Sequence, residues 1–143
     1  MRFLLDTNIL SDLVRHPQGV IADRILTVGE TRVCTSIIVA AELRYGAAKK
    51  ASTRLTGQLE AVLAAIDVLA FESPCDLTYG RLRATLEKSG QLVGGNDLLI
   101  AAQALTLGYT IVTDNDREFS RINQLRLENW LRPSCGPTVA SGT

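Results

Sequence analysis

The stretch Phe3-Leu4-Leu5-Asp6-Thr7-Asn8 sets the pattern for the whole chain, because an apolar run ends directly on a carboxylate. The apolar residues predict a short strand, and residues 8–14 then show the spacing of a short helix before Pro17. A strand that runs straight into a helix is the unit from which α/β folds are built. Asp6 would therefore lie at the tip of a strand.

The same alternation continues along the chain. Further strands are expected at 33–35, 68–71 and 110–113, with an edge strand around Leu125 and Leu127. Helices are expected at 20–28, 37–50, 52–66, 73–88 and 98–107. Strands that alternate with helices favour an α/β fold, in which a parallel sheet is covered by helices on both faces.

The composition limits the classes of function. At 143 residues, of which 46% are hydrophobic, the chain is long enough for one domain with a real core. Its 15 basic and 15 acidic residues give a formal net charge of zero, so overall charge does not attract it to a polyanion. Three cysteines without CxxC spacing and a single histidine argue against a zinc site.

The sequence also indicates where the protein resides. No stretch reaches the roughly 20 apolar residues of a membrane span, and Asp6 interrupts any signal-peptide core. We therefore expect a soluble, cytoplasmic protein with reduced thiols. Residues 133–143 lack periodicity, so we expect a flexible tail after a domain of residues 1–132.

Acidic segments stand where an apolar run ends or a helix begins: Asp6, Glu42, Asp97 and Asp114-Asn115-Asp116. Ligands bind at the carboxyl ends of the strands in a parallel sheet, so Asp6 and residues 114–116, which follow strands, would share one edge. Each acid alone has an ordinary interpretation. Asp6 and Asp97 fit helix caps, Glu42 a solvated helix glutamate, and residues 114–116 an Asx turn. They point to one site only when taken together.

Crowded carboxylates raise one another's pKa, so a shared site needs protons or a cation. Oxygen ligands without nearby His or Cys select a hard cation, Mg²⁺ or Mn²⁺. Such an ion activates water and stabilises negative charge on a phosphodiester. The residues alone therefore predict metal-assisted hydrolysis and leave the substrate open.

The densest basic stretch lies just after Glu42 and contains Arg44, Lys49 and Lys50. These side chains could contact phosphates beside the acidic site, or they could form an ordinary solvated helix face. Arg117 lies close to the acidic segment 114–116 and is a further candidate for phosphate contact.

Five pieces of the chain resemble the PIN-domain ribonucleases, and more narrowly the VapC toxins of bacterial type II toxin–antitoxin pairs. They are Phe-Leu-Leu-Asp-Thr-Asn at 3–8, Ala-Ala-Glu-Leu-Arg-Tyr-Gly at 40–46, Gly-Gly-Asn-Asp-Leu-Leu-Ile-Ala-Ala at 94–102, Ile-Val-Thr-Asp-Asn-Asp-Arg-Glu-Phe at 111–119 and Leu-Glu-Asn-Trp at 127–130. Any one piece alone is a weak signal. Their order and spacing make the resemblance specific over about residues 1–132.

The resemblance implies a three-layer α/β/α sandwich around a parallel sheet of about five strands, with magnesium-dependent endoribonuclease activity. Asp6 and Asp97 match the family's metal-binding aspartates, and Glu42 matches its second acid. The fourth position falls on Asn115, where many PIN domains carry Asp and VapC-like members often carry Asn. Asp116 is our first candidate to compensate for this change, and Asp114 is the other.

The resemblance also implies partners. It predicts a VapB-like antitoxin that covers the acidic groove, often with an arginine paired to the acids, and a homodimer within the toxin–antitoxin complex, with no membrane contact. The expected substrate is a structured RNA, either tRNA or ribosomal RNA, whose cleavage stops translation.

Two other functions remain open at this point. A phosphatase of the haloacid-dehalogenase type also begins with a strand ending in Asp, but it needs a second acid where this chain has Asn8. A catalytically silent PIN-like module, acting only as a surface for the antitoxin, is disfavoured because Asp6, Glu42 and Asp97 are all ionisable.

Overall fold

The computed structural model describes residues 1–132, and the expected tail at 133–143 lies outside the described residues. In the described part, no helix is both long and apolar enough to cross a membrane. The elements within it confirm the predicted α/β class.

A parallel sheet of five strands lies at the centre of the described residues, in the order β3-β2-β1-β4-β5. The strands are β1 Phe3–Leu5, β2 Val33–Ser36, β3 Asp67–Leu69, β4 Thr110–Val112 and β5 Arg126–Glu128. In register, Leu4 lies between Cys34 of β2 and Ile111 of β4. The first strand of the chain is therefore the middle strand of the sheet.

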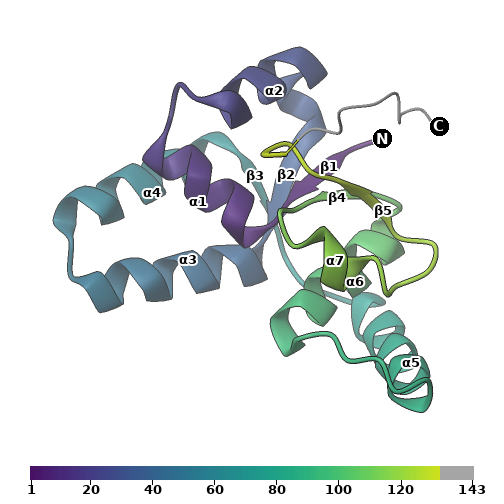
Figure 1. The fold of residues 1–143 in the computed structure, drawn as a ribbon. Coiled ribbons are helices and arrows are strands. Elements are labelled where there is room, and N and C mark those ends of the chain that lie inside the picture. The colour runs from purple at the N-terminus through teal and green to yellow at the C-terminus, as the bar shows by residue number, and fades with distance from the viewer. Residues whose placement is uncertain (133–143) are drawn as a thin grey trace.

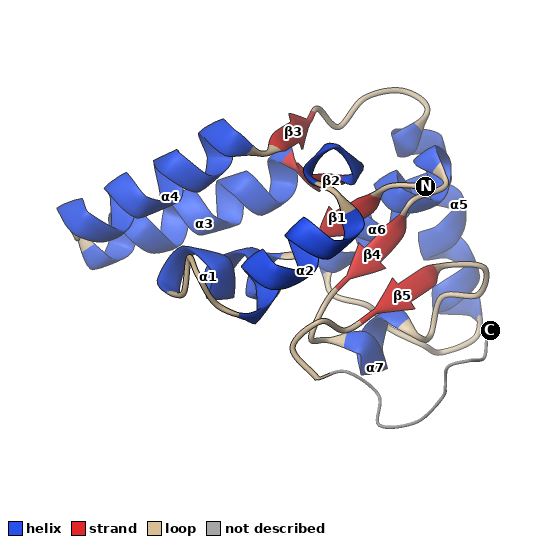
Figure 2. Ribbon diagram, turned by 90° about the horizontal axis from the view of Figure 1, so that it is seen from above, coloured by secondary structure: helices blue, strands red, loops and turns tan. Residues whose placement is uncertain are grey.

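Helices cover both faces of the sheet. They are α1 Thr7–Arg15, α2 Val20–Val28, α3 Ile37–Lys50, α4 Thr53–Ala65, α5 Cys75–Lys88, α6 Gly95–Leu107 and α7 Asp116–Phe119, with a short 3₁₀ turn at Glu30–Arg32. Figure 1 shows α1 and α2 on one side of the sheet and α5 and α6 on the other. Seen from above, α3 and α4 form a hairpin that projects beyond the sheet (Figure 2).

Burial explains why the short central strands are stable. Leu4 and Leu5 of β1 and Ile111 and Val112 of β4 are 0% exposed, because helices pack on both faces. Strands buried on two sides have continuous apolar runs, which is the pattern that begins at Phe3.

Two local differences from the sequence expectations affect the site. The helix expected from Leu98 begins at Gly95, since the Leu98 N–H closes a turn on the Gly94 carbonyl at 2.8 Å. Asp97 therefore lies inside the first helical turn. The short helix α7 was not anticipated, because four residues are too few for a visible apolar period.

The N-terminus of α3 offers a test of the fold. The Ser36 hydroxyl accepts a hydrogen bond from the Ile38 N–H at 3.0 Å and caps the helix that carries Glu42. We expect Ser36→Ala to lower the free energy of unfolding by about 1 kcal/mol, measured by urea denaturation. Ser89→Ala, at an exposed position, should change it by less than about 0.5 kcal/mol. An equal loss at both positions would contradict a capping role for Ser36.

Candidate functional site

Asp6 lies immediately after β1 and is 2% exposed. It occupies the N-cap position of α1, yet its side chain makes no capping hydrogen bond. Its Oδ2 accepts a hydrogen bond from the Thr113 hydroxyl at 2.8 Å, and its Oδ1 is buried with no hydrogen-bond partner among the described residues. The capping interpretation of Asp6 is therefore wrong, and a buried carboxylate oxygen remains available for a ligand.

The next two residues, Thr7 and Asn8, form hydrogen bonds to segments far away in the sequence. The Thr7 hydroxyl donates to Glu42 Oε1 at 2.5 Å, and Asn8 Oδ1 accepts from the Asp114 N–H at 3.1 Å. Asp6-Thr7-Asn8 thus contacts α3 and the loop after β4 through three consecutive side chains.

Glu42 lies on α3, which begins at Ile37, so it is in the second turn. It therefore lies beyond the first turn, where the helix dipole favours an acid. Its Oε2 accepts a hydrogen bond from Asn96 Nδ2 at 2.8 Å, in addition to the bond from Thr7. Donors from α1 and α6 thus hold both oxygens of this carboxylate in place.

Asp97 lies in the first turn of α6 beside a glutamate that the sequence analysis did not identify. Asn115 Nδ2 donates to Asp97 Oδ2 at 3.2 Å and to Glu118 Oε1 at 3.4 Å. Glu118 also accepts from the Gly94 N–H at 3.4 Å. Asn115, at the position where many PIN domains carry an acid, therefore bridges two carboxylates.

The four acids Asp6, Glu42, Asp97 and Glu118 form one electrostatic cluster. Burial raises the pKa of Asp97 to about 7, and a hydrogen bond with Glu118 and the charges of Asp6 and Glu42 add to the rise. The hydrogen bond from Asp97 lowers the pKa of Glu118, so the pair shares a proton near neutral pH. Burial raises the pKa of Asp6, against the effects of Thr113 and the Thr7 backbone.

Glu118 could have been recognised from its spacing. It follows Asn115 by three residues, which is one turn of helix, so both side chains lie on one face once α7 forms. The missing information was the helix itself.

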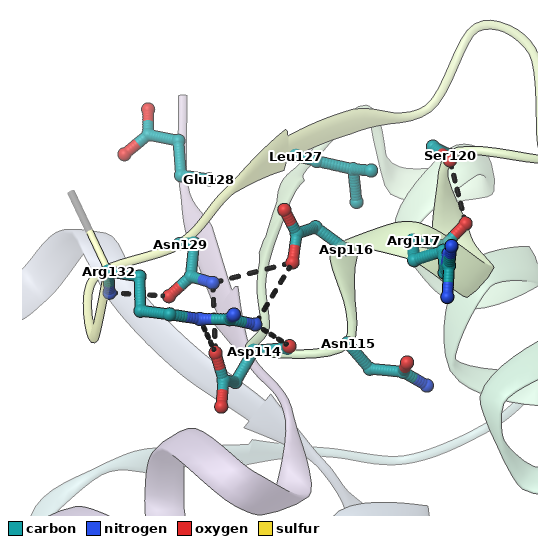
Figure 3. A pocket seen from close by; sticks show the side chains of 9 residues that line it. All are labelled: Asp114, Asn115, Asp116, Arg117, Ser120, Leu127, Glu128, Asn129 and Arg132. Carbon is teal, nitrogen blue, oxygen red and sulfur yellow. Dashed lines mark hydrogen bonds and ion pairs between the residues drawn. The ribbon is translucent and has the colours of Figure 1, made fainter. Parts of the chain in front are cut away.

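The expectation that Asp116 supplies the fourth acid is corrected by its contacts. Figure 3 shows Asp116 and Asn115 pointing in different directions, with Asp116 directed towards Asn129 and Arg132. Its Oδ1 lies 3.4 Å from Asn129 Nδ2 and 3.8 Å from an Arg132 nitrogen. The side chain therefore faces a neighbouring pocket of about 670 Å³.

Asp114 belongs to the same pocket. Its Oδ1 accepts from Asn129 Nδ2 at 3.0 Å and from Arg132 Nε at 2.8 Å, and these hydrogen bonds, that of Asn129 first, lower its pKa. A paired, ionised Asp114 fastens the chain after β5 to the loop after β4. It is not positioned as a substitute for the fourth acid.

The basic candidates separate into different environments. Arg44 forms a two-pronged ion pair with Glu60 of α4 at 2.8 and 2.9 Å, so its charge is already compensated. The Lys49 ammonium lies 5.9 Å from the centre of the Tyr45 ring. Arg117 lines the pocket that contains Asp116, and Lys50 lines a separate cleft that contains Glu42.

The donor set suits a hard cation. No three His, Cys, Asp or Glu side chains within residues 1–132 are arranged to hold a metal ion together. The buried and unpartnered Asp6 Oδ1, together with Asp97, whose raised pKa reflects crowded negative charge, still provides oxygen ligands that a divalent cation would stabilise. Mg²⁺ bound directly by one or two carboxylates, with water as its other ligands, fits this arrangement.

The PIN domain family model matches residues 3–125. Ribonuclease VapC2 of Rickettsia felis is 39% identical over 132 residues, covering 91% of this chain and 98% of that protein. The tRNA(fMet)-specific endonuclease VapC of Shigella flexneri is 34% identical, covering 91% of this chain and 98% of that protein.

Solved structures agree with these matches. VapBC2 from Rickettsia felis, bound to a DNA fragment from its promoter, contains a chain with a TM-score of 0.82 and 36% identity, covering 91% of this chain and 99% of that chain. DNA-bound VapBC from Salmonella typhimurium gives a TM-score of 0.82 at 34% identity, with 91% and 98% covered.

The shared proton predicts a pH dependence of stability. The folded-state pKa of Asp97 lies at about 7, above the ordinary value of an aspartate, so the folded protein binds the proton more tightly than the unfolded chain. This stabilisation is complete below pH 4 and is lost as the pH rises through about 7. Asp97→Asn should therefore be more stable than the wild type at pH 8 in EDTA, by roughly 1–2 kcal/mol because solvent screens a partly exposed group.

Urea denaturation of both proteins from pH 4 to pH 8 measures this difference. Asp76→Asn, on the exposed surface of α5, serves as the matched control and should follow the wild-type curve. Parallel curves for wild type and Asp97→Asn would contradict the shared proton.

Proposed function

This chain belongs to the PIN domain family, and on that premise we propose that it is a magnesium-dependent endoribonuclease toxin, neutralised by a cognate antitoxin. The observation that carries the proposal is the convergence of Asp6, Glu42, Asp97 and Glu118 at the carboxyl edge of the sheet, with Asp6 Oδ1 buried and unpartnered among the described residues. A phosphodiester is the substrate class for which such an all-carboxylate site suffices.

The names of related proteins support the choice of substrate. Proteins named ribonuclease VapC and tRNA(fMet)-specific endonuclease VapC align with this chain over nearly their full lengths. Structured RNA is therefore the proposed substrate, and tRNA is favoured over ribosomal RNA because the Shigella flexneri relative is named as a tRNA(fMet)-specific endonuclease.

Asp6 and Asp97 are the proposed magnesium ligands, and Mn²⁺ would fit the same oxygens. When bound, the ion supplies charge stabilisation at the phosphate and makes a nearby water more acidic. The protein's part is to keep these carboxylates close together, through Thr113 for Asp6 and Asn115 for Asp97.

Glu42 is the proposed acceptor for the proton of the attacking water. Its two oxygens are oriented by Thr7 and Asn96, so the carboxylate is fixed before substrate arrives. Asp97 holds the proton of its hydrogen bond to Glu118, which reduces the repulsion within the cluster while no cation is bound.

The dehalogenase-type alternative loses support at Asn8. Its Oδ1 accepts the Asp114 N–H, so the side chain at the position of the required second acid connects two segments of the fold. A group used in this way cannot deliver a proton to a leaving group.

The activity has a direct test. Incubation of the wild-type protein with purified tRNA and Mg²⁺ should yield discrete fragments, and EDTA should abolish them. Asp97→Asn and Glu42→Gln should each lower kcat by roughly 100-fold or more, since each removes charge stabilisation or proton transfer worth several kcal/mol. Cleavage that persists unchanged in EDTA would rule out the metal-dependent mechanism.

The fourth acid has its own test. Glu118→Gln should lower kcat by about tenfold or more, whereas Asp116→Asn should change it by less than about threefold, because the Asp116 carboxylate faces Arg132 and Asn129. Both variants remove one negative charge from α7, so the comparison holds the local charge change constant. The reverse order of effects would restore Asp116 to the site.

The antitoxin proposal is tested in cells. Structures of VapBC complexes align with this chain, and a cationic side chain from a partner would complement the clustered acids. Expression of the wild type should arrest growth, Asp97→Asn should not, and co-expression of a small antitoxin from a neighbouring gene should restore growth. If that neighbouring protein does not bind the purified chain, the toxin proposal is wrong, but the nuclease proposal is unaffected.

A further inference from the structure

Glu42 lies at one end of a cleft between α1, α3 and α4, with a volume of about 140 Å³. Two cations line it: Arg15 in the last turn of α1, and Lys50 in the last turn of α3. Glu42 is the one carboxylate among the lining residues. The cleft thus extends from the acidic site towards positive charge.

The charges of these two cations are not neutralised by acids of residues 1–132. Within residues 1–132, neither Arg15 nor Lys50 takes part in an ion pair, although Arg44 of the same helix α3 is paired with Glu60. Both side chains are exposed. An uncompensated cation beside an anionic site keeps its charge available for a ligand that carries negative charge on a repeating backbone.

Gly46 lines the cleft without a side chain. Gly46 lies one helical turn after Glu42, and a Cβ atom added there would meet nothing within 4 Å. Its backbone is helical, so its conformation does not require glycine. A larger side chain at this position would fill the cleft without altering any charge.

The distance along α3 from Glu42 to Lys50 separates the acidic site from the basic end of the cleft. Lys50 follows Glu42 by eight residues, which corresponds to roughly 12 Å along the axis of α3. This separation is large enough for the two ends of the cleft to contact different phosphates of one strand.

We infer that Arg15 and Lys50 bind a phosphate of the RNA strand next to the scissile one, with the strand lying in the cleft over Gly46. This inference rests on the proposed ribonuclease function and adds to it the direction in which the substrate leaves the acids. It also assigns separate roles to two parts of α3, with acceptance of the water proton at Glu42 and strand positioning at Lys50.

The experiment uses the full-length protein and unfractionated tRNA as the probe, with KM and kcat measured between 50 and 250 mM KCl. Arg15→Ala and Lys50→Ala should each raise KM about 5–10-fold and leave kcat within about twofold. Each should reduce the magnitude of the slope of log(kcat/KM) against log[KCl] by about 0.7–0.9, which is the slope expected for one phosphate contact. Gly46→Leu should raise KM and leave the salt dependence unchanged.

Lys88→Ala is the matched control, because Lys88 lies in the last turn of α5, a helix of the same length as α3, and outside the cleft. It should behave as the wild type. Thermal unfolding of every variant separates a binding defect from loss of fold.

The outcomes are distinguishable. If the wild type neither cleaves nor binds tRNA, the proposed ribonuclease function fails and this inference fails with it. If the wild type cleaves tRNA but Arg15→Ala and Lys50→Ala keep its KM, the inference alone is overturned. A loss of antitoxin binding with unchanged KM for tRNA would overturn it as well, since the cleft would then serve the protein partner.

Discussion

The hydrogen bond from the Asp6 N–H to the Val112 carbonyl, at 2.9 Å, marks the constraint on which the site depends. It fixes the carboxyl ends of the two adjacent parallel strands β1 and β4 at the same level of the sheet. Asp6 and Thr113, which are 107 residues apart in the chain, can then share a second hydrogen bond through their side chains. The remaining acids are arranged around this pair.

The cost of this arrangement is electrostatic. Four carboxylates that raise or lower one another's pKa would repel if all were ionised, and no basic side chain among residues 1–132 forms an ion pair with them. Hydroxyl and amide donors from Thr7, Thr113, Asn96 and Asn115 are used instead. Neutral donors orient the carboxylates but leave their charge uncompensated, so the affinity for a cation is retained.

The neighbouring pocket shows the opposite arrangement. There, Arg132 and Asn129 bind Asp114 and Asp116, and the acids become structural. The two acid clusters thus serve different purposes, and the adjacent residues Asn115 and Asp116 point to different ones (Figure 3). The distinction lies in their partners, since the residue types are the same.

The sequence alone determined the alternation of strands and helices, because apolar periodicity and helix capping are local properties that are visible in a short stretch of sequence. It also proposed Asp6, Glu42 and Asp97, since each lies at a strand end or in a helix whose position is locally visible, and the family resemblance added Asn115. Only the tertiary structure decided that Glu118 joins Asp97 while Asp116 turns to Arg132, and that Arg44 is paired while Lys50 is free of ion pairs among residues 1–132. These are contacts between side chains from separate elements, and their free energies depend on distances that the order of residues along the chain does not contain.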